Sequence, residues 1–233
     1  MVTHDRQLKV KICGNTSAED LALASEAGAD FGGVILDVPQ SPRSAPLDRA
    51  AELARDAPLP LVAVLLDAPL ASALRAAEAL RPAAIQLHGR ESEDFVASLR
   101  AQVECEVWKV LHLPPAQEGS FDAEVVLGSV RRYAEAGCDA VLLDTATEAS
   151  GRGGTGLTSD WERARSVVSA AELPVILAGG LNPANVSQAV ATVQPAGVDA
   201  ASGLEHSPGR KDAVAVREFV RLARAASARP ALE

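Results

Sequence analysis

Short runs of valine, isoleucine and leucine alternate along the chain with longer segments rich in alanine, glutamate and arginine, and this alternation restricts the fold most. The apolar runs have the length of buried strands, and the segments between them have the spacing of amphipathic helices. We predict strands at residues 8–13, 31–36, 61–66, 83–87, 107–111, 140–143, 174–178 and 197–201. We predict helices at residues 18–27, 47–56, 69–80, 92–100, 124–136, 160–171, 183–192 and 212–225. Repeated β/α units in this number predict a closed parallel (β/α)8 TIM barrel.

Cap and turn residues mark several helix ends. Ser17, Asp67 and Asn182 precede predicted helices, and the last two stand ahead of a proline that a first helical turn tolerates. Residues 26–30 (Glu-Ala-Gly-Ala-Asp) and 135–139 (Glu-Ala-Gly-Cys-Asp) predict two helix ends at which a glycine leads into the next strand.

An open, doubly wound sheet is the competing architecture, since alternation alone is compatible with both folds. That fold favours Gly-x-Gly-x-x-Gly after the first strand, whereas this chain continues Cys13-Gly14-Asn15-Thr16. The barrel is therefore the favoured prediction. With 233 residues, 48% of them hydrophobic, the chain can bury one large core. We expect a single domain over residues 1–233, with short flexible ends at about 1–7 and 226–233.

Charge and cysteine content argue against several classes of protein. The net charge of -9 disfavours nucleic-acid and anionic-membrane surfaces, which need a basic patch, but it permits a small anion held by local donors. Cys13, Cys105 and Cys138 are widely spaced and indicate neither a disulfide framework nor a zinc site. Residues 1–7 are polar, and no apolar stretch is long enough to span a bilayer. We expect a cytoplasmic protein with reduced thiols and no metal ion.

The residues after each predicted strand would converge on one rim of a barrel, where the catalytic groups of barrel enzymes lie. They are Cys13, the Ser41-Pro42-Arg43 loop, Asp67, His88, His112, Asp144, Gly179-Gly180 and Ser202-Gly203. A thiol, carboxylates, imidazoles, an arginine and glycine-rich turns predict an acid/base site with an anion pocket. Taken alone, however, Cys13 is typical of a small buried side chain and Asp144 of a turn cap.

The glycine turns after the last two strands predict a phosphate site. Gly179-Gly180 and Ser202-Gly203 would present backbone N–H groups, which hold phosphate without a lysine and so suit an acidic protein. Two ordinary tight turns are the alternative, which the paired position of the turns disfavours. Residues 152–156 are compatible with a loop that closes over a ligand and equally with a flexible connection.

An ordered series of motifs covers nearly the whole chain. The motifs are Lys11-Ile12-Cys13-Gly14, Ser41-Pro42-Arg43, Gln86-Leu87-His88-Gly89, Leu142-Leu143-Asp144, Gly153-Gly154-Thr155-Gly156 with Asp160-Trp161, the run from Pro174 to Pro183, and Ser202-Gly203. Each motif is weak alone, but the ordered set is specific, and the sequence resembles the phosphoribosylanthranilate isomerases of tryptophan biosynthesis. The resemblance implies a cofactor-free Amadori rearrangement of N-(5'-phosphoribosyl)anthranilate to 1-(o-carboxyphenylamino)-1-deoxyribulose 5-phosphate.

The same resemblance implies roles for individual residues. Asp144 would be the general acid that protonates the ribose ring oxygen, and Cys13 the general base that removes the proton from C2'. Arg43 would face the anthranilate carboxylate, Asp199 would hold Arg43, and His88 would also contact the substrate. The phosphate would lie at Gly154, Gly179, Gly180, Ser202 and Gly203. Lys11 receives no role, because we expect its side chain on the opposite face of the strand from Cys13.

Departures from the family pattern leave the substrate amine open. The second strand reads Gly33-Val34-Ile35-Leu36 where the family usually has Gly-Phe-x-Phe, Ser159 stands where phenylalanine is common, and aromatic residues make up only 3% of the chain. Neutral repacking is the interpretation we favour. The alternatives are a paralogue that isomerises a different phosphoribosylamine and a non-catalytic barrel that binds a phosphate ligand. Since the family includes monomers and dimers, we expect a monomer or a homodimer.

Overall fold

The computed structural model describes residues 7–116, 119, 121–145 and 158–228, and within these ranges the chain forms the predicted barrel. Its barrel strands are β1 (Lys9–Ile12), β2 (Phe31–Leu36), β4 (Leu61–Leu65), β5 (Ala84–Leu87), β6 (Glu106–Leu113), β7 (Ala140–Thr145), β8 (Val175–Leu177) and β9 (Gly197–Ala200). Each pairs in parallel with the next, and β9 pairs with β1, so the sheet closes on itself. The prediction of a TIM barrel is confirmed.

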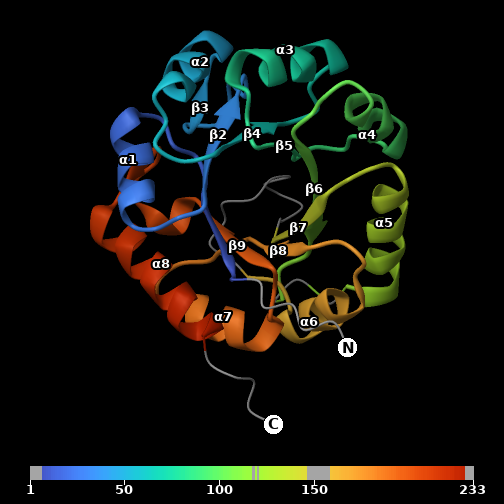
Figure 1. The fold of residues 1–233 in the computed structure, drawn as a ribbon. Coiled ribbons are helices and arrows are strands. Elements are labelled where there is room, and N and C mark those ends of the chain that lie inside the picture. Colours follow the sequence, from blue (N-terminus) through green and yellow to red (C-terminus); the bar gives the residue numbers. More distant parts are fainter. Residues whose placement is uncertain (1–6, 117–118, 120, 146–157, 229–233) are drawn as a thin grey trace.

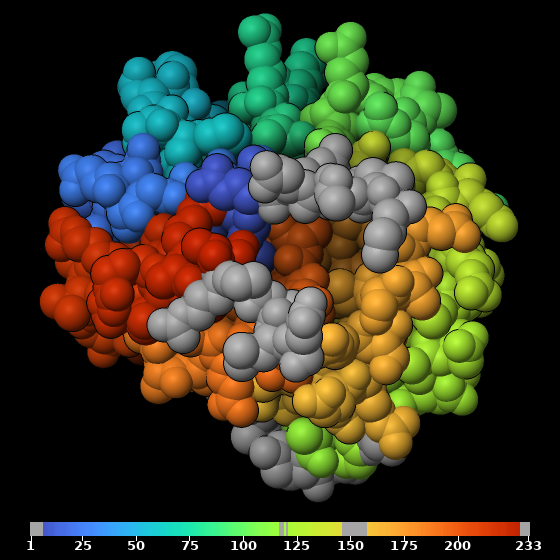
Figure 2. Space-filling model, turned by 60° about the horizontal axis from the view of Figure 1, so that its bottom comes forward, coloured from blue at the N-terminus to red at the C-terminus, as the bar shows by residue number. Residues whose placement is uncertain are grey.

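Helices form a ring outside the strands (Figure 1). Those of the described ranges are α1 (Ala18–Glu26), α2 (Leu47–Arg55), α3 (Leu70–Leu80), α4 (Glu93–Arg100), α5 (Ala123–Glu135), α6 (Trp161–Ala170), α7 (Val186–Val193) and α8 (Ala213–Ser227). Figure 2 shows α8, in red, between α7, in orange, and α1, in blue, so the last helix closes the ring onto the first. None of the helices in the described ranges combines the length and the apolar character that a membrane span needs.

Four short elements lie beyond the carboxyl ends of two barrel strands. β3 (Ser44–Ala45) pairs with β2. After β9 the chain makes a 3-10 turn, η1 (Ser202–Leu204), and a small hairpin of β10 (Glu205–Ser207) and β11 (Arg210–Lys211). Because catalytic loops of barrels lie at this end, these elements are placed where they can shape a site.

The cap signals identify three helix ends correctly. The Ser17 hydroxyl accepts a hydrogen bond from the Asp20 N–H at 3.2 Å, and α1 begins after it. Gly28 and Gly137 adopt φ angles of 87° and 96° just after α1 and α5. Only glycine takes this left-handed conformation without strain, which explains why both helices stop there.

Two predicted caps are wrong, and one helix is longer than predicted. Asp67 does not cap α3, which begins at Leu70 after Pro69. The Asp67 Oδ1 atom instead accepts a hydrogen bond from the Arg90 N–H at 2.6 Å. Asn182 closes a local turn by accepting from the Ala184 N–H at 2.8 Å, so α7 begins only at Val186. At the end of the chain, α8 continues to Ser227, past its predicted end and into the segment that we expected to be flexible.

Side chains fill the barrel below its rim. Val62, Trp108, Leu142 and Ile176 pack together there, and the Phe31 ring meets the Trp108 ring edge to face at 5.2 Å between centroids. Each such burial contributes about 1.5–3 kcal/mol to stability. A second apolar core lies between the strands and the helices. Because the lower barrel is packed, space for a ligand lies above it, at the carboxyl ends of the strands.

Candidate active site

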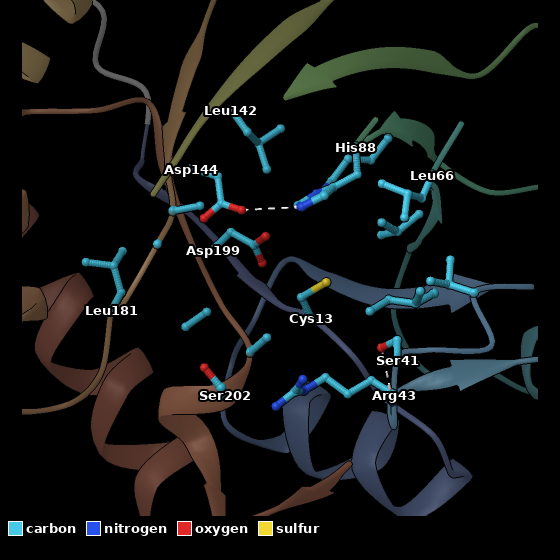
Figure 3. Close-up of a pocket in the computed structure, with 18 of the residues that line it drawn as sticks. Cys13, Ser41, Arg43, Leu66, His88, Leu142, Asp144, Leu181, Asp199 and Ser202 are labelled. Atoms are coloured by element: carbon cyan, nitrogen blue, oxygen red, sulfur yellow. Dashed lines mark hydrogen bonds and ion pairs between the residues drawn. The ribbon is translucent and has the colours of Figure 1, made fainter. Parts of the chain in front are cut away.

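A pocket of about 150 Å³ opens at the carboxyl ends of the strands (Figure 3). Its wall includes Cys13 directly after β1, Arg43 after β2, His88 directly after β5, Asp144 on β7 and Asp199 on β9. Alternate residues of a strand share a face, so inward positions at the upper ends of several strands reach the pocket. The structure therefore brings these five residues, far apart in sequence, to one site.

Cys13 points its sulfur into the pocket (Figure 3). Its N–H donates to the Ala200 carbonyl at 2.9 Å, which extends the pairing of β1 with β9, and the residue is only 6% exposed. Burial raises the pKa of the thiol, and the positive charge of Lys11 opposes this rise. The thiol is therefore a weak acid at rest and, once ionised, a correspondingly strong base.

Asp144 projects into the same pocket from near the end of β7 (Figure 3). Burial and, after it, the negative charge of Asp199 raise the pKa of this carboxyl to about 7. The Thr145 N–H and the Lys11 ammonium act in the opposite direction without cancelling the rise. Asp144 therefore keeps its proton up to neutral pH, where an exposed aspartate has lost it, and can donate it to a ligand.

His88 lies next to the Asp144 carboxyl. Its Nε2 lies 3.4 Å from Asp144 Oδ2, while burial and the neighbouring His112 lower its pKa to about 3 and keep the ring neutral. The amide nitrogen of Gln86 lies 3.3 Å from His88 Nδ1. Because an amide nitrogen only donates, Nδ1 is the acceptor and the ring proton is on Nε2. A neutral His88 thus lies beside the Asp144 carboxyl as a polar neighbour.

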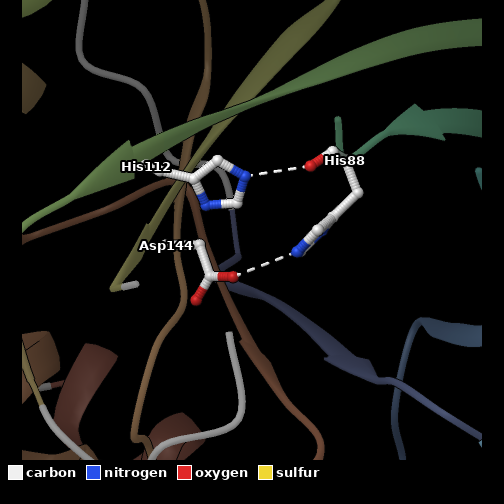
Figure 4. A group of neighbouring side chains, drawn as sticks. All are labelled: His88, His112 and Asp144. Atoms are coloured by element: carbon white, nitrogen blue, oxygen red, sulfur yellow. Dashed lines mark hydrogen bonds and ion pairs between the residues drawn. The ribbon is translucent and has the colours of Figure 1, made fainter. Parts of the chain in front are cut away.

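His112 completes a group of three with His88 and Asp144 (Figure 4). Its Nε2 lies 2.9 Å from the His88 carbonyl oxygen, to which it donates, and the two rings meet edge to face at 5.0 Å. One ligand atom from each residue lies within 4.8 Å of the others, and two imidazoles with a carboxylate are a donor set that transition metals accept. The His112 Nε2 proton is taken up by the His88 carbonyl oxygen, so the three residues form one connected polar cluster.

Lys11 and Asp199 form a buried ion pair beside the thiol, and here the prediction about Lys11 is wrong. The Lys11 side chain points into the barrel, and its Nζ lies 2.8 Å from Asp199 Oδ2. Although burial, the largest influence, lowers the pKa of Lys11, the charges of Asp199 and Cys13 raise it above its usual value. Lys11 is therefore a cation inside the pocket wall.

Arg43 is held by a partner other than the one predicted. Its Nε and Nη2 donate to the two carboxylate oxygens of Glu205, each at 2.8 Å, so Glu205 and not Asp199 holds this arginine. Lys211 Nζ also contacts Glu205, at 3.0 Å. Burial by itself would raise the pKa of Glu205, but the hydrogen bond from Arg43 and the charge of Lys211 bring it below its usual value. Glu205 is thus an anion that fixes the guanidinium at the pocket.

The two glycine turns pack against each other beside the pocket. Gly179 and Gly180 adopt φ angles of 83° and 66°, and a Cβ on Gly203 would lie 2.2 Å from the Leu181 carbonyl oxygen. The N–H groups of Gly179 and Gly180 make no hydrogen bond within the described ranges, and Ser202 opens the 3-10 turn η1, where first N–H groups are free. The predicted Gly154 lies outside the described residues.

The sequence of this chain matches a family model over most of its length. The model describes N-(5'-phosphoribosyl)anthranilate (PRA) isomerase and matches residues 10–222. The chain belongs to the phosphoribosylanthranilate isomerase family. An N-(5'-phosphoribosyl)anthranilate isomerase of Natronomonas pharaonis is 43% identical over 216 residues, which are 91% of this chain and 96% of that protein. One of Haloferax volcanii is 44% identical over 221 residues, or 94% of each chain.

Solved structures of family members have the same fold. The phosphoribosylanthranilate isomerase of Pyrococcus furiosus aligns with a TM-score of 0.78 at 32% identity and covers 94% of this chain and 99% of that one. A further structure, of an isomerase in complex with reduced 1-(o-carboxyphenylamino)-1-deoxyribulose 5-phosphate, aligns with a TM-score of 0.76 at 27% identity, with the same coverage. The family, its fold and its isomerase chemistry therefore agree with the resemblance found in the sequence.

Three residues in or beside the candidate site escaped prediction. Lys11 and Cys13 are two positions apart, so strand alternation alone would have placed both side chains on the same face. Glu205 lies in a loop whose course no strand pattern predicts. Gln86 lines the pocket and leaves its buried Oε1 without a hydrogen bond inside the described ranges. In contrast, Asp67 was expected at the site, but it links the loops after β4 and β5 instead.

Proposed function

We propose that this chain isomerises N-(5'-phosphoribosyl)anthranilate to 1-(o-carboxyphenylamino)-1-deoxyribulose 5-phosphate, with Asp144 as general acid and Cys13 as general base. The observation that carries the proposal is the placement of a thiol and a carboxyl group that keeps its proton at neutral pH in the wall of one pocket. A proton donor and a proton acceptor in one site are what an aldose-to-ketose rearrangement requires.

The first step opens the sugar ring. Asp144 gives its proton to the ribose ring oxygen, the bond between C1' and that oxygen breaks, and the nitrogen lone pair forms a cationic Schiff base. The raised pKa of Asp144 means that the proton is present near neutral pH, and neutral His88, whose Nε2 lies 3.4 Å from Asp144 Oδ2, is a polar neighbour of the carboxyl as it becomes an anion.

The second step removes the proton from C2'. The Schiff base acidifies this C–H bond, so the Cys13 thiolate takes the proton and the C–H electrons form the enolamine. The enolamine then tautomerises to the ketone as a proton is added at C1' and the C2' hydroxyl proton leaves. No oxidant or reductant is consumed, because substrate and product are isomers.

Two ends of the substrate have candidate partners in the pocket. We place the phosphate at the glycine turns, with Gly179, Gly180, Ser202 and Gly203 as donors and Gly154 as a further expected contact. We place the anthranilate carboxylate at Arg43, whose planar fork suits a carboxylate. Ile35, Val38 and Leu66 offer apolar surface to an aromatic ring.

The working state of the enzyme follows from its charge and its family. We propose that it acts in the cytoplasm, as a monomer or a homodimer, on a small phosphorylated sugar. Its net charge of -9 disfavours binding to nucleic acid or to an anionic membrane. Sedimentation velocity at several protein concentrations distinguishes the two assembly states.

The direct test follows the fluorescence of freshly prepared N-(5'-phosphoribosyl)anthranilate, which falls as the substrate isomerises. We expect turnover by the wild type, and Cys13→Ser and Asp144→Asn should each lower kcat by about a hundredfold or more with little change in KM. Cys105→Ser, at a half-buried thiol outside the pocket, is the matched control and should keep full activity. A folded wild type without turnover would overturn the proposal.

A further inference from the structure

Lys11 and Asp199 lie side by side on neighbouring strands, at the level of the barrel directly below the thiol. In the register of β1 and β9 they are direct partners, and their ion pair, at 2.8 Å, is almost completely buried. Lys11 stands two positions before Cys13, so both side chains project to the same face. Neither residue donates or accepts a proton in the proposed rearrangement.

Gly33 brings the lysine and the thiol together. It lies on β2, next to β1, and a Cβ built on it would lie 2.8 Å from Cys13 Sγ and 3.0 Å from Lys11 Cε. The ends of both side chains therefore occupy the space above one glycine. The geometry places an ammonium and a thiol in the same desolvated volume, where charges interact strongly.

Asp199 is only partly engaged by this lysine. Its Oδ2 accepts from Lys11, whereas its buried Oδ1 has no hydrogen-bond partner within the described ranges. Lys11 therefore neutralises the negative charge of Asp199 only in part. This charge raises the pKa of Cys13 and of Asp144, while the Lys11 charge lowers both. The more distant Lys211 also lowers the pKa of the thiol.

We propose that Lys11 and Asp199 are paired positioning residues whose opposite charges set the basicity of Cys13. Lys11 makes the thiolate available in a site that otherwise excludes charge, and Asp199 prevents a permanent thiolate–ammonium pair, which would be a weaker base. The role deepens the proposed isomerase function and rests on Cys13 as its base. A proton acceptor works best when its basicity is matched to the working pH, which explains why both charges are present.

The test measures the Cys13 thiol directly, without substrate. The rate at which iodoacetamide alkylates Cys13, followed by mass spectrometry of its peptide from pH 6 to pH 11, gives the midpoint of thiol ionisation. We expect Lys11→Met to raise this midpoint and slow alkylation near pH 8 by about tenfold, one pH unit being a factor of ten. Asp199→Asn should lower the midpoint, and Lys11→Arg should stay close to wild type. The Cys105 peptide is the internal control.

The direction of the two shifts decides the proposal. If Lys11→Met leaves the midpoint unchanged, or if Lys11→Met and Asp199→Asn shift it in the same direction, the proposal is overturned. Should Lys11→Met fail to fold, Lys11→Gln gives the same measurement with a neutral side chain that can still donate to Asp199. An inactive wild type with the two opposite shifts would contradict the isomerase function alone, whereas an active one without them would contradict this inference alone.

Discussion

Lys11 and Lys109 are equally buried, each 2% exposed, yet their surroundings differ. The Lys109 ammonium contacts the carbonyl oxygens of Leu87 and Gly89, at 3.2 and 2.7 Å, and the Glu91 carboxylate at 3.0 Å. The Tyr133 ring on α5 adds a contact at 5.8 Å, so Lys109 points outward to the helices. Lys11 points inward and has Asp199 as its hydrogen-bonded carboxylate partner.

The difference lies in how much hydrogen-bonding capacity each ammonium has left. An ammonium carries three protons, and Lys109 directs them at three oxygens of its own chain. Lys11 directs one at Asp199, and within the described ranges it makes no hydrogen bond to another oxygen. Burial of a charge therefore does not by itself mark a functional residue. A better indicator of a functional residue is a buried charged group that lies next to a cavity and uses only some of its hydrogen-bond donors.

The largest effect on stability should come from breaking the saturated cluster. Lys109→Met leaves Glu91, whose side chain is 3% exposed, as a buried carboxylate that retains only the N–H groups of Asp67 and Gly89. Loss of one partner of a buried pair costs about 3–5 kcal/mol. We expect the free energy of unfolding in urea to fall by that amount at pH 7, while kcat of the folded fraction stays near wild type.

A double variant separates the ion pair from the packing around it. Lys109→Met with Glu91→Leu removes both charges, and we expect it to recover most of the lost stability, because an apolar pair can replace a buried ion pair. If Lys109→Met also strongly lowers kcat of the folded fraction, Lys109 acts on the site and the contrast between the two lysines is wrong.

Replacing Asp144 should raise the stability of the fold rather than lower it, because burial disfavours the ionised form of this carboxyl in the folded state. Its folded pKa of about 7 exceeds the ordinary value of 3.8, so between these values the folded chain binds more protons than the unfolded chain, and this residue's contribution to stability falls as pH rises. The shift corresponds to at most about 4 kcal/mol. An asparagine at this position cannot ionise, so we expect Asp144→Asn to unfold at higher urea than wild type at pH 8, with a difference that shrinks as the pH falls toward 3.8. Lower stability of the variant at pH 8 would contradict the raised pKa.

The strands and most of the rim could be predicted because their physical signals are local. Buried parallel strands are continuous apolar runs, and a residue that ends such a run faces the carboxyl rim. Cys13, His88 and Asp144 could therefore be placed in one site from the sequence alone. The departures of the chain from its family divide between two places: Ile35 on the second strand lines the pocket, whereas Ser159 is buried and is not part of its wall.

The ion pairs could not be predicted, because they depend on side-chain direction and on loop course. The assignment of Asp199 to Arg43 was wrong since Asp199 faces Lys11 across adjacent strands, whereas Glu205 reaches Arg43 from the turn after β9. The prediction that Asn182 caps a helix was wrong for a related reason. An asparagine side chain can cap a helix or close the turn before it, and here it closes the turn.

The pH dependence of activity gives the smallest effect and the finest comparison of the two lysines. Up to about pH 7 Asp144 stays protonated while each pH unit gives tenfold more Cys13 thiolate, so kcat/KM should rise about tenfold per unit. Above pH 7 the loss of the acid offsets the gain in base, and we expect a plateau that ends where the thiol itself ionises, above its ordinary value of 9.0. Lys11→Met should move the start of the plateau upward, because Lys11 lowers the pKa of Asp144. It should also lower the plateau, because Lys11 is the main charge that lowers the pKa of Cys13 but only a minor influence on Asp144. Lys109→Met should leave the profile in place, and a shifted profile in that variant would mean that the cluster on the outer face of the barrel also acts on the site.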